Sequence, residues 1–367
     1  MKINEANVTY SSIVKIGEDV QKLEKESGLK YLKLHRGVMD VTNIDINSIN
    51  LDLNLNDPKL QQYTANDGFP ELIDKVKSNF NLQDHHLMIT PGGMAALDLI
   101  INSLSEENVY ISNFHWGSWN KIIKTHNKNI YTFDDFDLKP FMESKDYRKS
   151  GIVMLCYPSN PTGYTPDLMT IKNFLNWSKE NDITVILDLP YYYLFNNPND
   201  GLTDSFSDNV IVVSSFSKSV GLSGYRVGYL ATKNEELYKT LKIKALYKWN
   251  STSILPQYVI SKLLDNKKVV EDYKKETIEN ITNNINYLIE NDLLFDDYTS
   301  NPIGPFAVIN IGYEQLLNWR ISSVPLNNFA MMKKRQHENC SRISVAVNHK
   351  LFKEYFDKML SNEKTTI

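Results

Sequence analysis

The feature of the sequence that most restricts its fold is a regular alternation of short apolar runs with amphipathic helical patterns. The apolar runs are rich in β-branched and aromatic residues, and patterns such as LMTIKNFLNWSKEN at 168–181 separate them. Alternation of this kind predicts a mostly parallel sheet with helices on both faces, an α/β fold. The predicted strands lie at 108–112, 129–133, 151–157, 183–189, 209–215 and 227–231.

A different pattern towards the C-terminus predicts a smaller domain. A long amphipathic helix is predicted over 266–292, and strands at 306–312 and 341–347 would form a small sheet. An early helical pattern at 13–28 ends at a glycine. A chain of 367 residues exceeds the usual size of a single core. We therefore predict an N-terminal segment that contributes to the small domain (1–45), a large domain that contains the main sheet (46–260) and a small C-terminal domain (261–367).

Composition and charge exclude several classes of function. With 42% hydrophobic residues, 23% charged residues and a net charge of -4, the chain has no basic footprint for nucleic acid or for an anionic membrane. Two cysteines, Cys156 and Cys340, are too few for a disulfide framework or a cysteine metal site. No apolar run approaches roughly 18 residues, and the N-terminus lacks a signal-peptide core. We expect a cytoplasmic protein that acts on small molecules, without nucleic-acid, membrane or metal partners.

The stretch SSFSKSVGLSGYRVG, residues 214–228, places a lysine directly after a predicted strand. Ligands of open α/β sheets bind at strand ends, so Lys218 is positioned to meet one. A lysine amine becomes a nucleophile when burial and nearby cations lower its pKa, and Arg226 could be such a cation as well as a phosphate ligand. Ser215 and Ser217 add hydroxyl donors. An isolated lysine is usually a solvated surface residue. The spacing of Lys218, Arg226 and the serines together is what favours a ligand-binding site.

Three other stretches place polar or small residues at the ends of predicted strands. Asp188 ends the apolar run ITVILDL, where a buried carboxylate needs a cationic partner. Alone it would be equally typical of a helix N-cap or a loop. Asn160 lies in the turn SNPTG, which by itself is common. Gly92 and Gly93 in TPGGMAALDLI open directly into a helix whose N-terminus attracts an anion.

Together these stretches resemble the class I/II aminotransferases, fold type I enzymes of the aspartate aminotransferase superfamily that depend on pyridoxal 5′-phosphate. SFSKSVGLSGYRVG is similar to the family's lysine signature, and TPGGMAALDLI, YPSNPTG and DLPY occur in the family's order. The resemblance extends from about Tyr63 to Arg342. It implies a mostly parallel seven-stranded sheet flanked by helices, together with a smaller α+β domain.

The resemblance also implies a role for each matching residue around the cofactor. Lys218 would form the Schiff base with the cofactor aldehyde and later carry the substrate proton. Asp188 would keep the ring nitrogen protonated, while Tyr191 and Asn160 would bind the phenolic oxygen. The other cofactor-binding residues that it implies are Gly92, Gly93, Met94, Ser215, Ser217 and Arg226 at the phosphate, and Trp116 stacked on the ring. Trp119, Trp177 and Trp249 are expected to be core residues.

Two further matches concern the substrate and a second subunit. Tyr63 in YTANDG resembles a tyrosine that reaches the phosphate of the partner subunit's cofactor, which implies a homodimer. Arg342 in SRISVAV resembles the arginine that binds the substrate α-carboxylate, with Asn160 beside it. Standing alone, Arg342 could instead be an edge-strand residue paired with Glu338.

The activity implied is transfer of an α-amino group between an amino acid and a 2-oxo acid by a ping-pong mechanism. A lyase, synthase or decarboxylating enzyme of the same fold would keep the same cofactor ligands and is the alternative. A cofactor-binding regulator is disfavoured because the chain has no basic patch.

Substrate choice is less determined by the sequence. The stretch YKWNSTSILPQ contains no arginine where aspartate-specific members carry one, which argues against a dicarboxylate bound in that way. Lys248 or Arg36 could substitute, although each could equally be a surface charge. Several aromatic residues could line the pocket and would favour a neutral or aromatic amino acid, namely Trp116, Trp119, Tyr191 and Tyr192.

Overall fold

The large sheet of the molecule contains seven strands in the order β2-β8-β7-β6-β5-β3-β4. The computed structural model describes residues 8–133, 137–144, 150–295 and 302–361. Strands β3 to β7 run parallel to one another, whereas β8 is antiparallel to both of its neighbours, β2 and β7. The strands are β2 (His86–Thr90), β3 (Asn108–Ser112), β4 (Asn129–Phe133), β5 (Gly151–Cys156), β6 (Ile183–Asp188), β7 (Val210–Ser215) and β8 (Gly228–Thr232).

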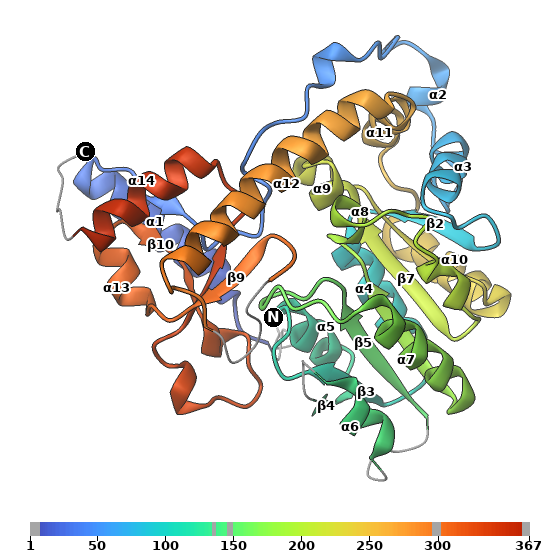
Figure 1. Cartoon of the computed structure of the whole chain (residues 1–367). Coiled ribbons are helices and arrows are strands. Elements are labelled where there is room, and N and C mark those ends of the chain that lie inside the picture. The colour runs from blue at the N-terminus through green and yellow to red at the C-terminus, as the bar shows by residue number, and fades with distance from the viewer. Residues whose placement is uncertain (1–7, 134–136, 145–149, 296–301, 362–367) are drawn as a thin grey trace, which may run out of the picture.

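Helices cover both faces of this sheet, as Figure 1 shows. They are α3 (Pro70–Asn79), α4 (Gly93–Ser103), α5 (Ser118–Thr125), α6 (Leu138–Glu143), α7 (Leu168–Glu180), α10 (Glu235–Trp249) and α11 (Ile254–Asp265). Successive residues of a strand point to opposite faces. In β7, Ile211 and Val213 pack with α4, α5 and α10, while Val210 and Val212 pack with α3, α7 and α11. The predicted α/β architecture is confirmed.

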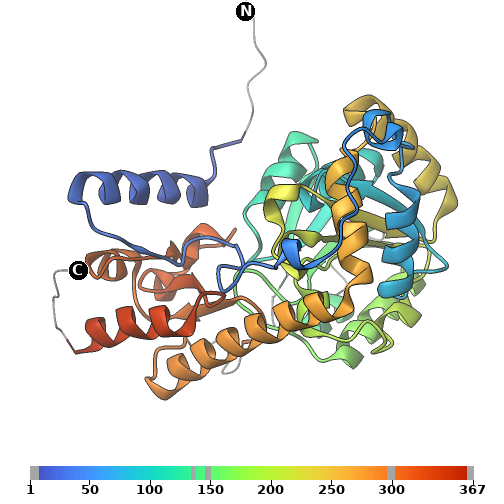
Figure 2. The same ribbon diagram turned by 90° about the horizontal axis from the view of Figure 1, so that it is seen from above.

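A smaller α+β domain is built from both ends of the chain. Its strands are β1 (Leu32–Lys33), β9 (Phe306–Ile309), β10 (Ile321–Ser322), β11 (Val324–Pro325) and β12 (Ser341–Ser344). Strands β9, β12 and β11 form an antiparallel sheet, and β1 pairs in parallel with β10. Helix α12 (Lys267–Glu290) runs from the large sheet to this domain (Figures 1 and 2). The Asn284 side chain on α12 donates to the carbonyls of Val345 and Val347, both at 2.9 Å.

The remaining helices are α1 (Ser12–Ser27), α2 (Pro58–Gln61), α8 (Tyr192–Phe195), α9 (Phe216–Ser219), α13 (Tyr313–Asn318) and α14 (His349–Leu360). The early helix predicted at 13–28 is present as α1, and it ends at Gly28, whose φ of 71° is a left-handed value that glycine adopts readily. Within the described parts of the chain, no helix combines the length and the apolar character that crossing a bilayer requires.

The sequence analysis missed the two-residue strands β1, β10 and β11 of the smaller domain and, in the seven-stranded sheet, strand β2. The residues of β2, HLMIT, are few, and only Ile89 and Thr90 are β-branched. The strand forms because β8 offers it a complete antiparallel partner, with Met88 opposite Leu230. Its four residues from Leu87 to Thr90 are buried. Tertiary pairing, rather than local propensity, therefore decides this element.

Candidate active site

Residues from the carboxyl ends of three neighbouring parallel strands line one cavity of about 300 Å³. Asn160 follows β5, Asp188 ends β6, and Lys218 follows β7 through the short helix α9. Parallel strands bring their carboxyl ends to the same edge of a sheet, where ligands of such folds bind. Arg342, from β12 of the smaller domain, lines the same cavity. The structure therefore brings together four residues that the sequence analysis singled out separately.

Lys218 is held in the cavity in a state that favours loss of its proton. Its Nζ donates a hydrogen bond to the carbonyl of Gly37, which belongs to the segment after β1. Burial, followed by the charges of Arg342, Arg226 and Arg36, lowers the pKa of Lys218 to about 8. At pH 7 about a tenth of the amine is then neutral, several hundred times the fraction for an ordinary lysine. The side chain is consequently suited to nucleophilic attack on a carbonyl.

Asp188 is a buried carboxyl group with a neutral donor and no cation beside it. The Trp119 Nε1–H donates to Asp188 Oδ2 at 3.2 Å, and Asp188 is only 6% exposed. Burial raises the pKa of Asp188 to about 7, against the lowering effect of that hydrogen bond. Among the described residues, Asp188 forms no ion pair. The cationic partner expected from the sequence is not supplied by these residues, so the site fits a ligand that carries a protonated nitrogen.

Asn160 and Tyr191 form a hydrogen-bonding pair beside Asp188. Asn160 Nδ2 donates to the Tyr191 hydroxyl at 3.3 Å. Burial raises the pKa of Tyr191, so the phenol keeps its proton and can donate a hydrogen bond to another oxygen. Asn160 Oδ1 is buried without a hydrogen-bond partner among the described residues. Both side chains line the cavity with spare hydrogen-bonding capacity.

The N-terminus of α4 and the connection between β7 and β8, which carries Arg226, form an anion cradle. Gly92 precedes α4 with a φ of 87°, and a Cβ added there would lie 2.5 Å from Arg226 Nη2. Only glycine lets the arginine approach the helix N-terminus so closely. The Arg226 Nη1 donates to the Ser223 carbonyl at 2.9 Å, which holds the guanidinium in place. Helix dipole and guanidinium therefore favour an anion at the same point.

Four more residues predicted to bind phosphate lie around this cradle. Gly93, Met94, Ser215 and Ser217 all line the cavity, and the two serines are buried. Thr90 is not available as an additional donor, because its hydroxyl donates to the Gly92 carbonyl at 3.0 Å. The donor set fits a phosphate group.

Arg342 is a buried cation clamped between two aromatic rings. Its guanidinium carbon lies 4.4 Å from the ring centroid of Phe306 and 4.9 Å from that of Phe329. Nη2 donates to the His35 carbonyl at 3.2 Å, whereas Nε and Nη1 have no partner among the described residues. Burial lowers its pKa to about 10, so it remains charged at neutral pH. The alternative of an ion pair with Glu338 is wrong, because Glu338 is exposed while Arg342 is only 1% exposed.

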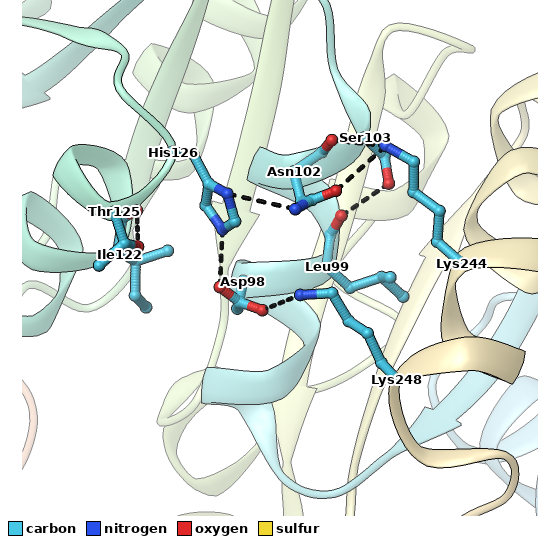
Figure 3. Close-up of polar contacts among 9 residues, drawn as sticks. All are labelled: Asp98, Leu99, Asn102, Ser103, Ile122, Thr125, His126, Lys244 and Lys248. Atoms are coloured by element: carbon cyan, nitrogen blue, oxygen red, sulfur yellow. Dashed lines mark hydrogen bonds and ion pairs between the residues drawn. The ribbon is translucent and has the colours of Figure 1, made fainter. Parts of the chain in front are cut away.

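Of the remaining candidate residues, one lines the cavity and the others lie outside it. Trp116 lines the cavity, whereas Tyr63 lies outside its lining and is 85% exposed. Arg36 is exposed and also lies outside the lining, so it acts on Lys218 through its charge alone. Figure 3 shows Lys248 on α10 paired with Asp98 of α4, whose other oxygen meets His126 Nε2 at 2.7 Å. This network ties α4, which carries the anion cradle, to α5 and α10.

Trp119 is the residue whose role the sequence analysis missed. It was expected to be a core residue, and its side chain is indeed buried. A buried indole N–H nevertheless needs an acceptor, and here the acceptor is Asp188. The signal in the sequence is its place three residues after Trp116, as the second residue of α5.

The sequence matches the family described as aminotransferase class I and II over residues 32–357. It is 27% identical over 233 residues to the probable aspartate aminotransferase of Methanocaldococcus jannaschii, covering 58% of this chain and 62% of that protein. It is 25% identical over 310 residues to the histidinol-phosphate aminotransferase of Sulfurimonas denitrificans, covering 77% and 78%. The chain spans 50 to 62% of the length of three aspartate aminotransferase relatives that it matches.

Solved structures share the fold at low sequence identity. The aspartate aminotransferase of Thermus thermophilus with maleate has a TM-score of 0.83 at 15% identity, covering 98% of this chain and 100% of that one. An aminotransferase of Mycobacterium tuberculosis has a TM-score of 0.84 at 15% identity, covering 98% of each chain. At this identity the likeness supports the fold alone.

Replacing Asp188 by Asn should stabilise the protein in the absence of ligands at pH 8 more than at pH 5. Between its ordinary pKa of 3.8 and the folded value of about 7, the folded protein holds a proton that the unfolded chain has released. Stability therefore falls as the pH rises through this interval, and above it the buried charge destabilises the fold fully. The asparagine keeps an acceptor for Trp119 but carries no charge. We expect a gain on the order of 2–4 kcal/mol at pH 8.

Melting temperatures of the ligand-free wild type and the Asp188→Asn variant at the two pH values measure this effect. Asp208→Asn, at an exposed position, is the matched control and should show no such pH-dependent gain. Equal gains at both pH values, or a loss at pH 8, would contradict the assignment of a buried, unpaired carboxyl group.

Replacing Trp119 by Phe should raise the pKa of Asp188 further, because the hydrogen bond that favours the carboxylate is removed. The carboxyl stretch of Asp188 in infrared difference spectra, identified by its loss in Asp188→Asn, follows the titration directly. We expect the midpoint to move up by about one pH unit, as for loss of one hydrogen bond to a charged group. Trp177→Phe is the control. An unchanged midpoint would mean that Trp119 only packs.

Proposed function

The chain belongs to the aminotransferase class I and II family, and from this premise we propose that it is a pyridoxal 5′-phosphate-dependent aminotransferase. It would move an α-amino group between an amino acid and a 2-oxo acid in a ping-pong reaction. Family membership, and the names of the relatives, support the reaction class. The geometry of the cavity supports the cofactor.

The observation that carries the proposal is that one cavity contains two ionisable groups whose pKa values burial shifts in opposite directions. Lys218 is an amine whose pKa is lowered to about 8, and Asp188 is a carboxyl group whose pKa is raised to about 7. Neither group neutralises the other, since the main causes of both shifts are burial and other neighbours. A ligand with an aldehyde at one position and a basic ring nitrogen at another would bond to the amine and bring a positive charge to the carboxylate.

Each part of pyridoxal phosphate has residues that would hold it. The Lys218 Nζ would bind the aldehyde carbon, and Asp188 would hold the proton on the ring nitrogen. Asn160 and the Tyr191 hydroxyl would bind the phenolic oxygen, and Trp116 would cover a ring face. When bound, the cofactor supplies an electron sink for a carbanion at the substrate Cα. The residues proposed at the phosphate are Gly92, Gly93, Met94, Ser215, Ser217 and Arg226.

The remaining residues of the cavity would orient the substrate. Arg342 keeps the donors Nε and Nη1 without partners among the described residues, and these can bind a carboxylate through charge-assisted hydrogen bonds. Asn160 lies in the same cavity, and the second N–H of its Nδ2 could donate to that carboxylate. With the α-carboxylate fixed, the Lys218 amine would take the proton from Cα, since a base whose pKa lies near 8 is neutral often enough to do so.

A lyase or decarboxylating enzyme would use the same ligands, so the products must distinguish the two activities. The purified protein, loaded with pyridoxal phosphate and given single amino acids without an oxo acid, should release one equivalent of 2-oxo acid per site and then stop. Addition of a second oxo acid should restart it. Continued release without an acceptor would instead indicate the lyase.

Lys218→Ala should lose at least about 1,000-fold in this half-reaction, as for removal of a catalytic acid–base group. Lys267→Ala, an exposed lysine at the start of α12, is the control. Borohydride treatment followed by peptide mass analysis should place the cofactor on the peptide that contains residue 218. Retained activity in Lys218→Ala would overturn the proposal.

We further propose that the chain acts as a homodimer, with residues 46–260 as its large unit and residues 1–45 and 261–367 as its small one. Tyr63 and Tyr247 are each 85% exposed, and Ile243 is 62% exposed. Asn66 Nδ2 donates to the Asn250 carbonyl at 2.8 Å, which places the Tyr63 segment beside the end of α10. Exposed aromatic and aliphatic side chains on adjacent segments are typical of a protein interface. In such a dimer, the Tyr63 hydroxyl would reach the partner's phosphate cradle.

Light scattering at micromolar concentration should give twice the chain mass for the wild type and a monomer for Tyr247→Glu, because a charge would be buried in the interface. Tyr63→Phe should keep the dimer but bind pyridoxal phosphate about 10-fold more weakly, the effect of one hydrogen bond to a charged group. A monomeric wild type, or unchanged cofactor affinity in Tyr63→Phe, would contradict this arrangement.

A further inference from the structure

A second hollow, of about 670 Å³, opens beside the candidate active site. Its walls are residues 8–13, the start of α5, and residues 327–333. Ile13 and Trp116 line both hollows, so the two are adjacent at these residues. Phe329, which packs against the Arg342 guanidinium, also lines the second one. We call this second hollow the lysine groove.

The lysine groove is positively charged. Lys121, Lys124 and Lys333 are the charged side chains among its described lining residues, and no aspartate or glutamate is among them. Lys121 Nζ donates to the Tyr10 carbonyl at 3.2 Å and so fixes one wall. The wall residue Tyr10 donates its hydroxyl to the carboxylate of Glu18, and Glu18 itself does not line the groove. Like charges in a concave wall strengthen the local field and attract anions.

Two of these lysines have their charge available for a ligand. Lys124 and Lys333 are exposed, and neither forms an ion pair within the described ranges. Elsewhere on the surface some exposed lysines pair, as Lys239 does with Glu235, and others such as Lys267 have no ion-pair partner in the described parts of the chain. What distinguishes Lys124 and Lys333 is therefore their place in one hollow. Among the described residues, these two cations of the groove have no ion-pair partner, in a chain whose net charge is -4. The uncharged lining of the groove adds a hydroxyl donor from Ser118 and an amide donor from Asn328, whereas the Asn120 amide is bonded to His115.

The aromatic lining that suggested a neutral or aromatic substrate is smaller than the sequence implied. Trp119 donates its indole N–H to Asp188, and the Tyr192 hydroxyl is bonded to Asp200. Neither residue lines the candidate active site cavity or the lysine groove. The hollow beyond Trp116 is lined by Tyr10 and Phe329 as well as by three lysines, so the surface that a substrate side chain would meet there is mixed in polarity and cationic.

We propose that the lysine groove binds the distal anionic group, a phosphate or a carboxylate, of an extended amino-acid substrate whose α-carboxylate lies on Arg342. This inference rests on the proposed aminotransferase function and names the substrate class of the same site. The side chain would pass Trp116 and end near Lys124 and Lys333. A short dicarboxylate such as aspartate would not reach, because the lysines line the outer hollow and not the cavity that holds Arg342.

Matched amino acids test the proposal in the holoenzyme. L-norleucine is the neutral probe, L-2-aminopimelate carries a distal carboxylate, and L-2-amino-7-phosphonoheptanoate carries a distal phosphonate. We expect kcat/KM for at least one anionic probe to exceed that for norleucine by about 10-fold, a preference that falls as salt rises. The anionic probe with the higher kcat/KM indicates whether the natural distal group is a carboxylate or a phosphate ester.

The double variant Lys124→Gln/Lys333→Gln should reduce this preference to about twofold, since each exposed charge pair contributes modestly. Lys239→Gln/Lys267→Gln removes the same charge from exposed sites outside the groove and should keep the wild-type preference. Equal kcat/KM for all three probes, or a preference that the groove variant retains, would overturn the proposal while leaving the aminotransferase function intact.

A binding measurement keeps the test independent of turnover. Calorimetric titration of the protein with L-2-amino-7-phosphonoheptanoate should give at least about fivefold weaker binding to the groove variant than to the wild type and the control variant. If no amino acid transfers its amino group, the proposed function fails, and this titration still decides whether the groove recognises anions.

Discussion

The structure of the site depends on one constraint, the burial of two ionisable groups that the protein itself does not neutralise. Lys218 and Asp188 lie in the same cavity, and burial is the largest cause of the pKa shift of each. A shift of one pKa unit corresponds to about 1.4 kcal/mol, so each group destabilises the ligand-free fold by a few kcal/mol when it is charged. A ligand that bonds to the amine and brings a cation to the carboxylate recovers this free energy on binding. The free energy that burial of these two groups costs thus becomes affinity for a ligand of one particular chemistry.

The fold sustains this constraint because the sheet below the cavity is buried on both faces. Helices pack on each side of β5, β6 and β7, so the strand ends that carry Asn160, Asp188 and Lys218 are fixed by apolar contacts that do not involve the cavity. The antiparallel strand β8 closes the anion cradle. A Cβ at Gly228 would lie 2.7 Å from the Gly92 carbonyl carbon, so glycine at this position lets the strand pack against the start of α4. Arg342 comes from the smaller domain, and the site is therefore complete only when both sheets are in place.

The parts of the site that were predictable from the sequence are those set by local chain geometry. Lys218, Asp188 and Asn160 each stand at a strand end, and the topology of parallel strands brings such positions together without knowledge of the packing. The parts that were not predictable depend on contacts between distant segments. Whether Trp119 packs or donates depends on the position of β6, 69 residues away. The pairing of Lys248 with Asp98 spans 150 residues. The lysine groove joins three segments from both ends and the middle of the chain, so no single stretch of sequence carries its signal.

The cations of the site link recognition of anions to the basicity of Lys218. Arg342 and Arg226 are, after burial, the largest causes of the lowered pKa of Lys218. The proposed ligands of these arginines are a carboxylate and a phosphate, and each would cancel the charge that acts on the lysine. In the ligand-free protein both arginines keep the amine partly neutral and able to attack an aldehyde. With a carboxylate on Arg342, as proposed, the amine would regain basicity at the stage when it would have to accept a proton from the substrate. The same two side chains would therefore favour nucleophilic attack before the substrate binds and proton transfer afterwards, without any movement of the backbone.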